Sequence, residues 1–258
     1  MTGPSPSRSP VATAPPTDLM RGKLRGRGFR AVRRVLWLVL GPALRMRVDG
    51  LERVPATGPL LVVCNHLHNA DPVIVSVAFP RPLHFMAKKE LFGVPVIGWL
   101  IRKVGAFPVD RGTADRAAIR HAEAALRQGI AVGMFPEGTR SLTGALQRAH
   151  PGVGLLALRS GAPVLPMVVT GSERLPLNGA KGRRPTAGRR EVLVQFGDTF
   201  AIPRELDGHR VTADQATDMM MAAVARMLPE QYRGVYADSV AGDVKPTPRA
   251  QSRRDFVG

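Results

Sequence analysis

The stretch Leu60-Leu61-Val62-Val63-Cys64 is an uninterrupted apolar run, and the polar turn Asn65-His66-Leu67-His68-Asn69-Ala70-Asp71 follows it at once. A short apolar run bounded by polar residues is typical of a strand that is buried on both faces. A short helix is predicted directly after the turn, over residues 72–79. A buried strand that leads into a helix is half of a βαβ unit, so this stretch favours an α/β fold.

Segments of the same two kinds alternate along the rest of the chain. Further strands are predicted over residues 83–86, 105–109, 130–135, 164–169 and 192–196. Further helices are predicted over residues 113–128, 153–159 and 212–228. We therefore expect an α/β fold with a mostly parallel central sheet flanked by helices, because parallel strands need long crossover connections.

The composition changes at both ends of the chain and divides it into four parts. Residues 1–17 are rich in Pro, Ser, Thr and Ala, and we expect them to be a disordered tail, as we do residues 238–258. A basic and apolar segment occupies residues 18–48, and the folded domain is predicted over residues 49–237. Within that domain, residues 178–190 are predicted to form a Gly-rich basic loop.

The segment of residues 18–48 is predicted to be an N-terminal amphipathic helix that lies in a membrane interface. Its apolar run, Val35 to Leu44, is ten residues long and has arginines on both sides. A membrane-spanning helix needs about 20 apolar residues. Flanking arginines and Trp37 inside the run suit a helix at the membrane surface. A helix that packs on the core and exposes its basic end is the alternative.

The charge balance limits the partners of this protein. Its 37 Lys and Arg residues against 20 Asp and Glu residues give a formal net charge of +17. Such a charge attracts nucleic acid, an anionic lipid surface or a phosphorylated substrate. Aromatic residues make up only 5% of the chain, and no helix-turn-helix or zinc pattern occurs, which disfavours a nucleic-acid-binding protein. The single cysteine, Cys64, excludes a disulfide within the chain.

The turn after the first predicted strand carries residues suited to acid–base chemistry. His66 has the side chain that titrates nearest to neutral pH, and Asp71 follows five residues later, across the turn. Asp71 can therefore accept a hydrogen bond from one ring nitrogen and direct the other toward a substrate. Two alternatives stay open here. Asp71 can cap the next helix, or His66, His68 and Asp71 can form a metal site.

Two more charged segments follow predicted strands. Gly105-Ala106-Phe107-Pro108-Val109-Asp110-Arg111 is the first, and Phe135-Pro136-Glu137-Gly138-Thr139-Arg140-Ser141 is the second. We expect Arg111 and Arg140 to lie at neighbouring strand ends and to clamp a phosphate group between them. The alternative is that the charges form surface ion pairs, which contribute little to stability.

The three segments and a fourth, Val164-Leu165-Pro166, together resemble the four blocks of the glycerolipid acyltransferases. The best-known members of that family are the 1-acylglycerol-3-phosphate acyltransferases. The resemblance covers roughly residues 50–230, and its first and third blocks are the most specific. One departure is His68, where members of the family commonly have serine. A serine hydrolase is excluded, because no Gly-x-Ser-x-Gly sequence occurs.

The resemblance implies a function and a set of site residues. His66 would be the general base and Asp71 would orient it, while Arg111, Glu137, Gly138, Thr139 and Arg140 would bind the acceptor. An acyl group would pass from acyl-CoA or acyl-carrier protein to the hydroxyl of 1-acylglycerol-3-phosphate, or of another lyso-lipid or amino-lipid. No metal or other cofactor and no nucleic acid would be needed. We expect a peripheral or monotopic membrane protein on the cytoplasmic face.

Overall fold

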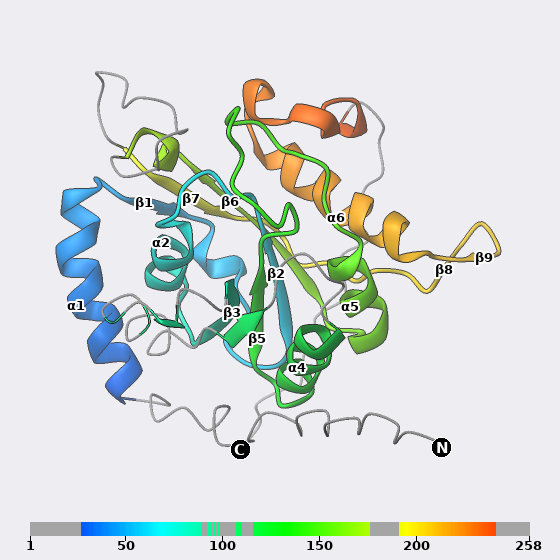
Figure 1. Ribbon diagram of the computed structural model, residues 1–258, viewed down its shortest axis with the longest axis horizontal. Coiled ribbons are helices and arrows are strands. Elements are labelled where there is room, and N and C mark those ends of the chain that lie inside the picture. The colour runs from blue at the N-terminus through cyan, green and yellow to red at the C-terminus, as the bar shows by residue number, and fades with distance from the viewer. Residues whose placement is uncertain are drawn as a thin grey trace, which may run out of the picture.

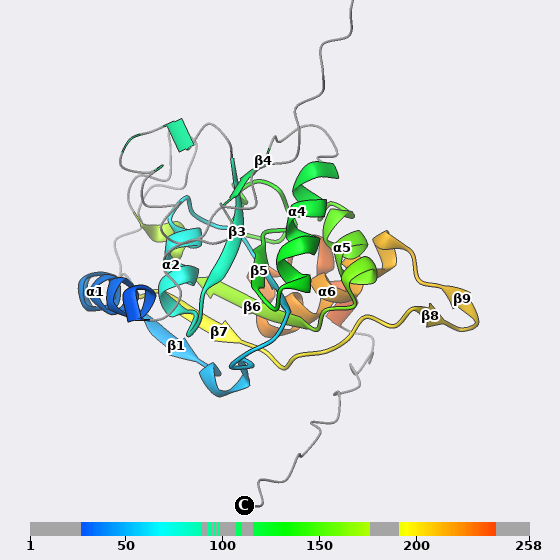
Figure 2. The same ribbon diagram turned by 90° about the horizontal axis from the view of Figure 1, so that it is seen from below.

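Seven strands form the central sheet of the protein (Figures 1 and 2). The structure is a computed structural model that describes residues 27–88, 92, 93, 95, 98, 107–109, 116–175 and 191–240. The predicted tail of residues 1–17, the basic loop of residues 178–190 and all but three residues of the second predicted tail lie outside the described residues. The strands lie in the order β1-β7-β6-β2-β5-β3-β4.

The sheet is mixed but mostly parallel, as the sequence predicted. Its strands are β1 (Arg47–Asp49), β2 (Leu60–Cys64), β3 (Leu83–Lys88), β4 (Phe107–Val109), β5 (Ala131–Met134), β6 (Val164–Thr170) and β7 (Leu193–Phe196). Every neighbouring pair is parallel except β6 and β7, so β1 and β7 run against the other five. The sequence analysis missed β1, because a three-residue strand with one apolar side chain carries no periodic signal.

The helices are α1 (Arg27–Ala43), α2 (Asp71–Ala78), α4 (Arg116–Arg127), α5 (Gly152–Ser160) and α6 (Ala213–Met227). The last four differ from the predicted ranges by one to three residues at their ends. The helix predicted over residues 18–48 ends at Ala43, because β1 begins at Arg47, and its residues 18–26 lie outside the described residues. Helix α5 ends at Gly161, which has a φ of 61° in the left-handed region that glycine tolerates best. Helix α6 begins with a capping box, in which Thr212 and Gln215 each accept a hydrogen bond from the other's main-chain N–H.

Several short elements fall outside the predicted pattern. A hairpin of β8 (Glu205–Leu206) and β9 (His209–Arg210) projects from the domain, at the opposite end from α1 in both views (Figures 1 and 2). Short 3-10 helices occur at η2 (Leu51–Arg53), η4 (Ser172–Arg174), η5 (Glu230–Tyr232), η6 (Gly234–Tyr236) and η7 (Asp238–Val240). The sheet thus begins at Arg47, two residues before the predicted start of the domain, and the described structure continues to Val240, three residues beyond the predicted end at residue 237.

The central strand β2 is buried on both faces and separates two apolar cores. Leu61 and Val63 belong to a core that includes residues of α4, α5 and α6. Leu60, Val62 and Cys64 belong to the other core, which includes residues of α2. Successive side chains of a strand point to opposite faces, so an all-apolar strand has to be covered twice. This burial fixes the position of the turn that follows β2.

Helix α1 packs against α2 and leaves an apolar face exposed. Nη1 of Arg33 lies 3.3 Å from the carbonyl oxygen of Phe79, at the carboxyl end of α2, where a positive charge is favourable. Val35, Leu38 and Val39, spaced three and four residues along the helix, expose 60%, 64% and 62% of their surface. Among the described residues, no helix is long and apolar enough to span a membrane.

Helices α5 and α6 approach so closely that the contact requires glycine. A Cβ atom at Gly154 would lie 1.9 Å from the carbonyl oxygen of Ala213, whereas one at Gly152 would have only an ordinary contact of 3.6 Å with Ile119. We expect Gly154→Ala to destabilise the fold by about 1–3 kcal/mol through overpacking. Gly152→Ala, in the same helix, should change the stability by less than about 1 kcal/mol. Urea unfolding of both variants measures the difference, and equal stabilities would contradict this account.

Candidate active site

All of the predicted site residues except Arg111 follow two adjacent parallel strands at the carboxyl edge of the sheet. Strand β2 ends at Cys64, and strand β5, which pairs with it through Val63 and Met134, ends one residue before Phe135. The turn of residues 65–71 and the loop that begins at Phe135 therefore leave the sheet side by side. Ligands of open α/β sheets bind at this edge.

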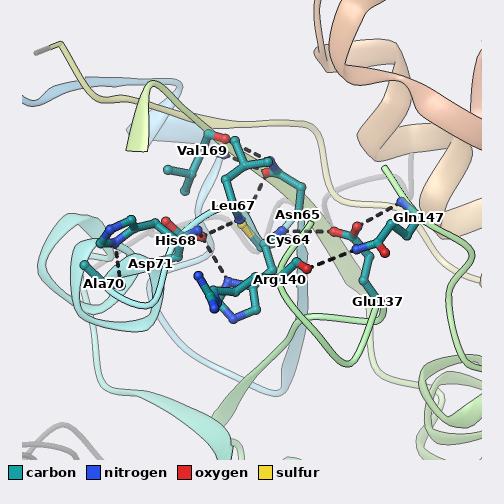
Figure 3. A network of polar contacts seen from close by, with 11 residues as sticks. Cys64, Asn65, Leu67, His68, Ala70, Asp71, Glu137, Arg140, Gln147 and Val169 are labelled. Atoms are coloured by element: carbon teal, nitrogen blue, oxygen red, sulfur yellow. Dashed lines mark hydrogen bonds and ion pairs between the residues drawn. The ribbon is translucent and has the colours of Figure 1, made fainter. Parts of the chain in front are cut away.

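Asp71 is the centre of the polar network in the first turn (Figure 3). Its Oδ2 atom lies 3.0 Å from Nδ1 of His66 and accepts hydrogen bonds of 2.6 Å from the main-chain N–H groups of Leu67 and His68. The side chain of Asp71 is fully buried and that of His66 is almost so. The contact between His66 and Asp71 that the sequence predicted is therefore present, and it lies inside the protein.

This arrangement decides which nitrogen of His66 carries a proton. Oδ2 is an acceptor for two N–H groups already, so Nδ1 must donate to it, and Nε2 is left with its lone pair. An imidazole held in this tautomer is ready to accept a proton at Nε2. Asp71 is the first residue of α2, but the N-cap is Ala70 and no side chain caps this helix, so the alternative of a capping role for Asp71 is wrong.

An aromatic stack holds the plane of the His66 ring. The ring of Phe135 stacks on the imidazole with a centroid separation of 4.4 Å, and Phe85 stacks on Phe135 at 5.4 Å. A Cβ atom at Gly133 would lie 2.4 Å from the Phe85 ring, so a glycine at this position makes room for the stack. The hydrogen bond between Nδ1 and Asp71 does not by itself fix the plane of the imidazole, because the ring could turn about the line of that bond. Stacking restricts that rotation, and the sequence analysis did not assign this role to Phe135.

Glu137 joins the two loops through their main chains (Figure 3). Its Oε1 atom accepts a hydrogen bond of 3.0 Å from the N–H of His66, and its Oε2 atom accepts one of 2.9 Å from the N–H of Gln147. Burial raises the pKa of this carboxyl from 4.5 to about 7, although both hydrogen bonds act in the opposite direction. Glu137, predicted to bind the acceptor, thus also fixes the position of the His66 main chain.

The other predicted binding residues lie around the same loop. Gly138 has a φ of 70°, and a Cβ atom there would lie 2.8 Å from the His150 ring, so both the conformation and the space favour glycine. Thr139 is exposed, and Arg140 is half-buried with its carbonyl oxygen 3.2 Å from Nε2 of Gln147. Their roles in binding stay predictions.

The expected placement of Arg111 next to Arg140 is wrong in one respect. Strand β4, which precedes Arg111, does not neighbour β5, because β3 lies between them. The sequence gives strand positions but not their order in the sheet, so it suggested adjacency that the topology does not provide. Arg111 itself lies outside the described residues.

Two residues of the first turn have structural roles that the sequence analysis did not assign. The side-chain amide of Asn65 donates to the carbonyl oxygen of Val169 and accepts from its N–H, both at 2.8 Å, and so ties the turn to β6. Nδ1 of His68 accepts a hydrogen bond of 2.9 Å from the N–H of Ala70. A serine hydroxyl makes a similar local bond, so His68 serves the turn as serine would.

Cys64 lies next to the turn and is buried. Burial, together with the charges of Asp71 and Glu137, raises the pKa of Cys64 well above its ordinary value. Cys64 is therefore a neutral thiol, and a thiol is a poor nucleophile. Within the part of the chain that the structure describes, no three His, Cys, Asp or Glu side chains are grouped so as to hold a metal ion.

Fold and site together define an α/β domain with a buried histidine–carboxylate pair at the carboxyl edge of its sheet. The family model described as Acyltransferase matches residues 45–170 of this chain. These residues include β1 and extend to the end of β6, and so contain both loops of the site.

Curated relatives carry one common name. The 1-acyl-sn-glycerol-3-phosphate acyltransferase of Bacillus subtilis is 34% identical over 128 residues, which are 49% of this chain and 63% of the relative. The protein of that name from Pseudomonas aeruginosa is 30% identical over 148 residues, 56% of this chain and 57% of the relative. A chloroplastic one from Arabidopsis thaliana is 28% identical over 57% of this chain and 42% of its own length. The matches thus span about half the length of these relatives.

A solved structure shares the fold. The crystal structure of the 1-acyl-sn-glycerophosphate acyltransferase from Thermotoga maritima superposes with a TM-score of 0.61 at 24% sequence identity. The match covers 80% of this chain and 83% of that chain. The α/β architecture of the site-bearing domain is therefore that of a known acyltransferase fold.

Glu137 gives the site a dependence on pH that has a definite sign. A carboxyl with a raised pKa holds its proton more tightly in the folded state, so its contribution to stability is present below pH 4.5 and is lost as the pH rises through about 7. We expect the wild type to lose on the order of 1–3 kcal/mol relative to Glu137→Gln between pH 5 and pH 8. Urea unfolding at the two pH values measures this change. A constant difference between the two proteins would show that Glu137 does not titrate in this range.

Proposed function

We propose that this chain transfers a fatty acyl group from an acyl thioester to the free hydroxyl of 1-acylglycerol-3-phosphate, which gives phosphatidate for phospholipid biosynthesis. The observation that carries the proposal is the 3.0 Å contact between Nδ1 of His66 and Oδ2 of Asp71, buried at the carboxyl edge of the sheet. The name shared by the relatives supports the choice of acceptor.

The proposed reaction proceeds by direct attack of the acceptor. Nε2 of His66 removes the proton of the acceptor hydroxyl as its oxygen attacks the thioester carbonyl carbon. The tetrahedral intermediate then collapses, the carbon–sulfur bond breaks, and the thiolate leaves. The proton held by His66 passes to the leaving sulfur, so the base is regenerated. Asp71 stabilises the imidazolium that forms between these steps, and no Ser or Cys of the protein has to react.

The acceptor phosphate gives the arginines a role. We propose that the guanidinium groups of Arg140 and Arg111 bind the phosphate, since a planar fork of donors matches its oxygens. Gly138 and Thr139 lie beside Arg140 and would contact the glycerol part of the acceptor. Glu137 would act chiefly by holding the loop in place, because its two oxygens already accept main-chain N–H groups.

The proposed chemistry needs neither a metal ion nor a redox cofactor. A thioester is an activated acyl donor, and the base and its orienting carboxylate both come from the protein. Either acyl-CoA or acyl-carrier protein satisfies these requirements as the donor. The reaction therefore depends on two substrates that meet at the edge of the sheet.

We propose that the protein binds the surface of an anionic membrane through α1, on the cytoplasmic face. Support comes from the exposed apolar face formed by Val35, Leu38 and Val39, and from Trp37, which is partly exposed on the same helix. The formal charge of +17 favours an anionic surface. A lysophospholipid acceptor resides in such a surface, so this contact would bring the site to its substrate.

The first test is a transfer assay with purified protein in phospholipid vesicles, using oleoyl-CoA and lysophosphatidate. We expect His66→Ala to lower kcat/KM by about a thousandfold, because a positioned general base contributes about 10²–10⁴-fold. His209→Ala is the matched control, since His209 lies on the projecting hairpin. Product formation is followed by chromatography of the labelled lipid.

Two outcomes of this assay would contradict the proposal. Equal activity of wild type and His66→Ala would remove His66 as the base. Transfer to lyso-lipids that lack the phosphomonoester, but not to lysophosphatidate, would show that the proposed acceptor is wrong and that the protein is still an acyltransferase.

A second test concerns the membrane contact. The double variant Leu38→Asp/Val39→Asp places two negative charges on the exposed face of α1, so we expect it to lose binding to vesicles that contain phosphatidylglycerol. Leu206→Asp, a charge placed on an exposed leucine at the opposite end of the molecule, is the control and should bind as the wild type does. Vesicle sedimentation measures the bound fraction. Full binding by the double variant would move the membrane contact away from α1.

A further inference from the structure

A segment outside the residues that match the family model reaches the active site through one intermediate loop. This segment, residues 229–240, consists of η5, η6 and η7 and is called here the C-terminal clasp. We propose that the C-terminal clasp holds the loop of residues 141–150 in place, and through it Glu137 and His66. Gly234 and Tyr236 are then positioning residues of the active site. The kinetic part of this inference rests on the proposed acyl transfer.

The clasp binds the loop of residues 141–150 along its main chain. The N–H of Leu146 donates to the carbonyl oxygen of Tyr232 at 2.8 Å, and the carbonyl oxygen of Leu146 accepts from the N–H of Val235 at 3.2 Å. The hydroxyl oxygen of Tyr236 accepts a further bond of 3.1 Å from the N–H of Ala149. The N–H and the carbonyl oxygen of Leu146 and the N–H of Ala149 are therefore all paired with the C-terminal clasp.

The other side of the same loop is bonded to the active site. The N–H of Gln147, next to Leu146, donates to Oε2 of Glu137, whose Oε1 atom accepts the N–H of His66. The N–H of Ser141, at the start of the loop, donates to the carbonyl oxygen of His66 at 2.7 Å. The N–H of His66 is thus paired with Glu137, which Gln147 of the loop binds, and its carbonyl oxygen is paired with Ser141 of the loop. Because the loop has no helix or strand of its own, its shape depends on these contacts.

Gly234 permits the close approach between clasp and loop. Its φ is 51°, and a Cβ atom there would lie 2.1 Å from the carbonyl oxygen of Leu146. Any larger residue would therefore push the clasp away from the loop.

The clasp is itself anchored to the rest of the domain. Tyr236 is buried in the same core as Leu146 and the residues of α6. The hydroxyl of Tyr232 donates to Oε1 of Glu173 in η4 at 2.9 Å, and Nε of Arg233 donates to the carbonyl oxygen of Leu228 at 3.0 Å. An element fixed in this way can restrain the loop, because it does not move with it.

The experiment compares alanine substitutions at two glycines that both have a positive φ, 51° at Gly234 and 76° at Gly208. Gly234→Ala introduces both a strained φ and a clash with the loop. Gly208→Ala introduces the strained φ alone, because Gly208 has a φ of 76° and nothing lies within 4 Å of a Cβ atom there. Two quantities are measured for each full-length variant. One is hydrogen exchange of the loop and of the His66 amide, and the other is kcat and KM in the transfer assay.

We expect faster exchange in residues 141–150 and at the His66 amide in Gly234→Ala, but not in Gly208→Ala. We also expect kcat of Gly234→Ala to fall by about tenfold to a hundredfold, with KM changed by less than about threefold, since small displacements of reacting groups are costly. Tyr236→Phe, which removes only the acceptor of the Ala149 N–H, should change both quantities in the same direction to a smaller degree. If Gly234→Ala does not fold, Tyr236→Phe tests the inference in its place.

Exchange that rises only within residues 229–240, with a kcat equal to that of Gly208→Ala, would overturn the inference. If the wild type transfers no acyl group, the proposed function fails, and hydrogen exchange alone decides the role of the clasp. Unchanged protection of the His66 amide in both Gly234→Ala and Tyr236→Phe would then reject it.

Discussion

One carboxylate oxygen, Oδ2 of Asp71, organises the turn that follows β2. It accepts hydrogen bonds from Nδ1 of His66 and from two main-chain N–H groups of the same turn, and these groups are buried. The position of this oxygen depends in turn on β2, which is fixed by apolar cores on both of its faces, and on α2, which begins at Asp71. The imidazole of His66 is thus oriented by a deeply buried part of the sheet, because only a rigid support keeps a tautomer and a ring plane fixed.

The rest of the site consists of restraints on His66 that come from distant parts of the chain. Phe135 fixes the plane of its ring, Glu137 binds its N–H, and Ser141 binds its carbonyl oxygen. Asn65 ties the preceding residue to β6. These contacts explain why the two most specific blocks of the sequence lie at neighbouring strand ends. The position of this turn therefore depends on a loop from the adjacent strand.

The two sides of helix α1 have different surroundings. Nη1 of Arg33 lies near the carbonyl oxygen of Phe79 at the end of α2, whereas the side chains of Val35, Leu38 and Val39 are exposed. An exposed apolar face of this kind would suit the contact with a membrane surface that is proposed above.

Most elements of the fold and the contact between His66 and Asp71 follow from local patterns in the sequence. Apolar runs such as Leu60–Cys64 and the spacing of His66 and Asp71 are local properties, so β2, most of the helices and the histidine–aspartate contact were predicted correctly. Only the tertiary structure decided the order of the strands, the addition of β1, and the reversal of β7. It also decided that Glu137 binds the main chain of His66, that Phe135 stacks on its ring, and that the C-terminal clasp reaches the loop of residues 141–150. Each of these depends on contacts between residues far apart in the chain, and such contacts leave no periodic pattern in the sequence.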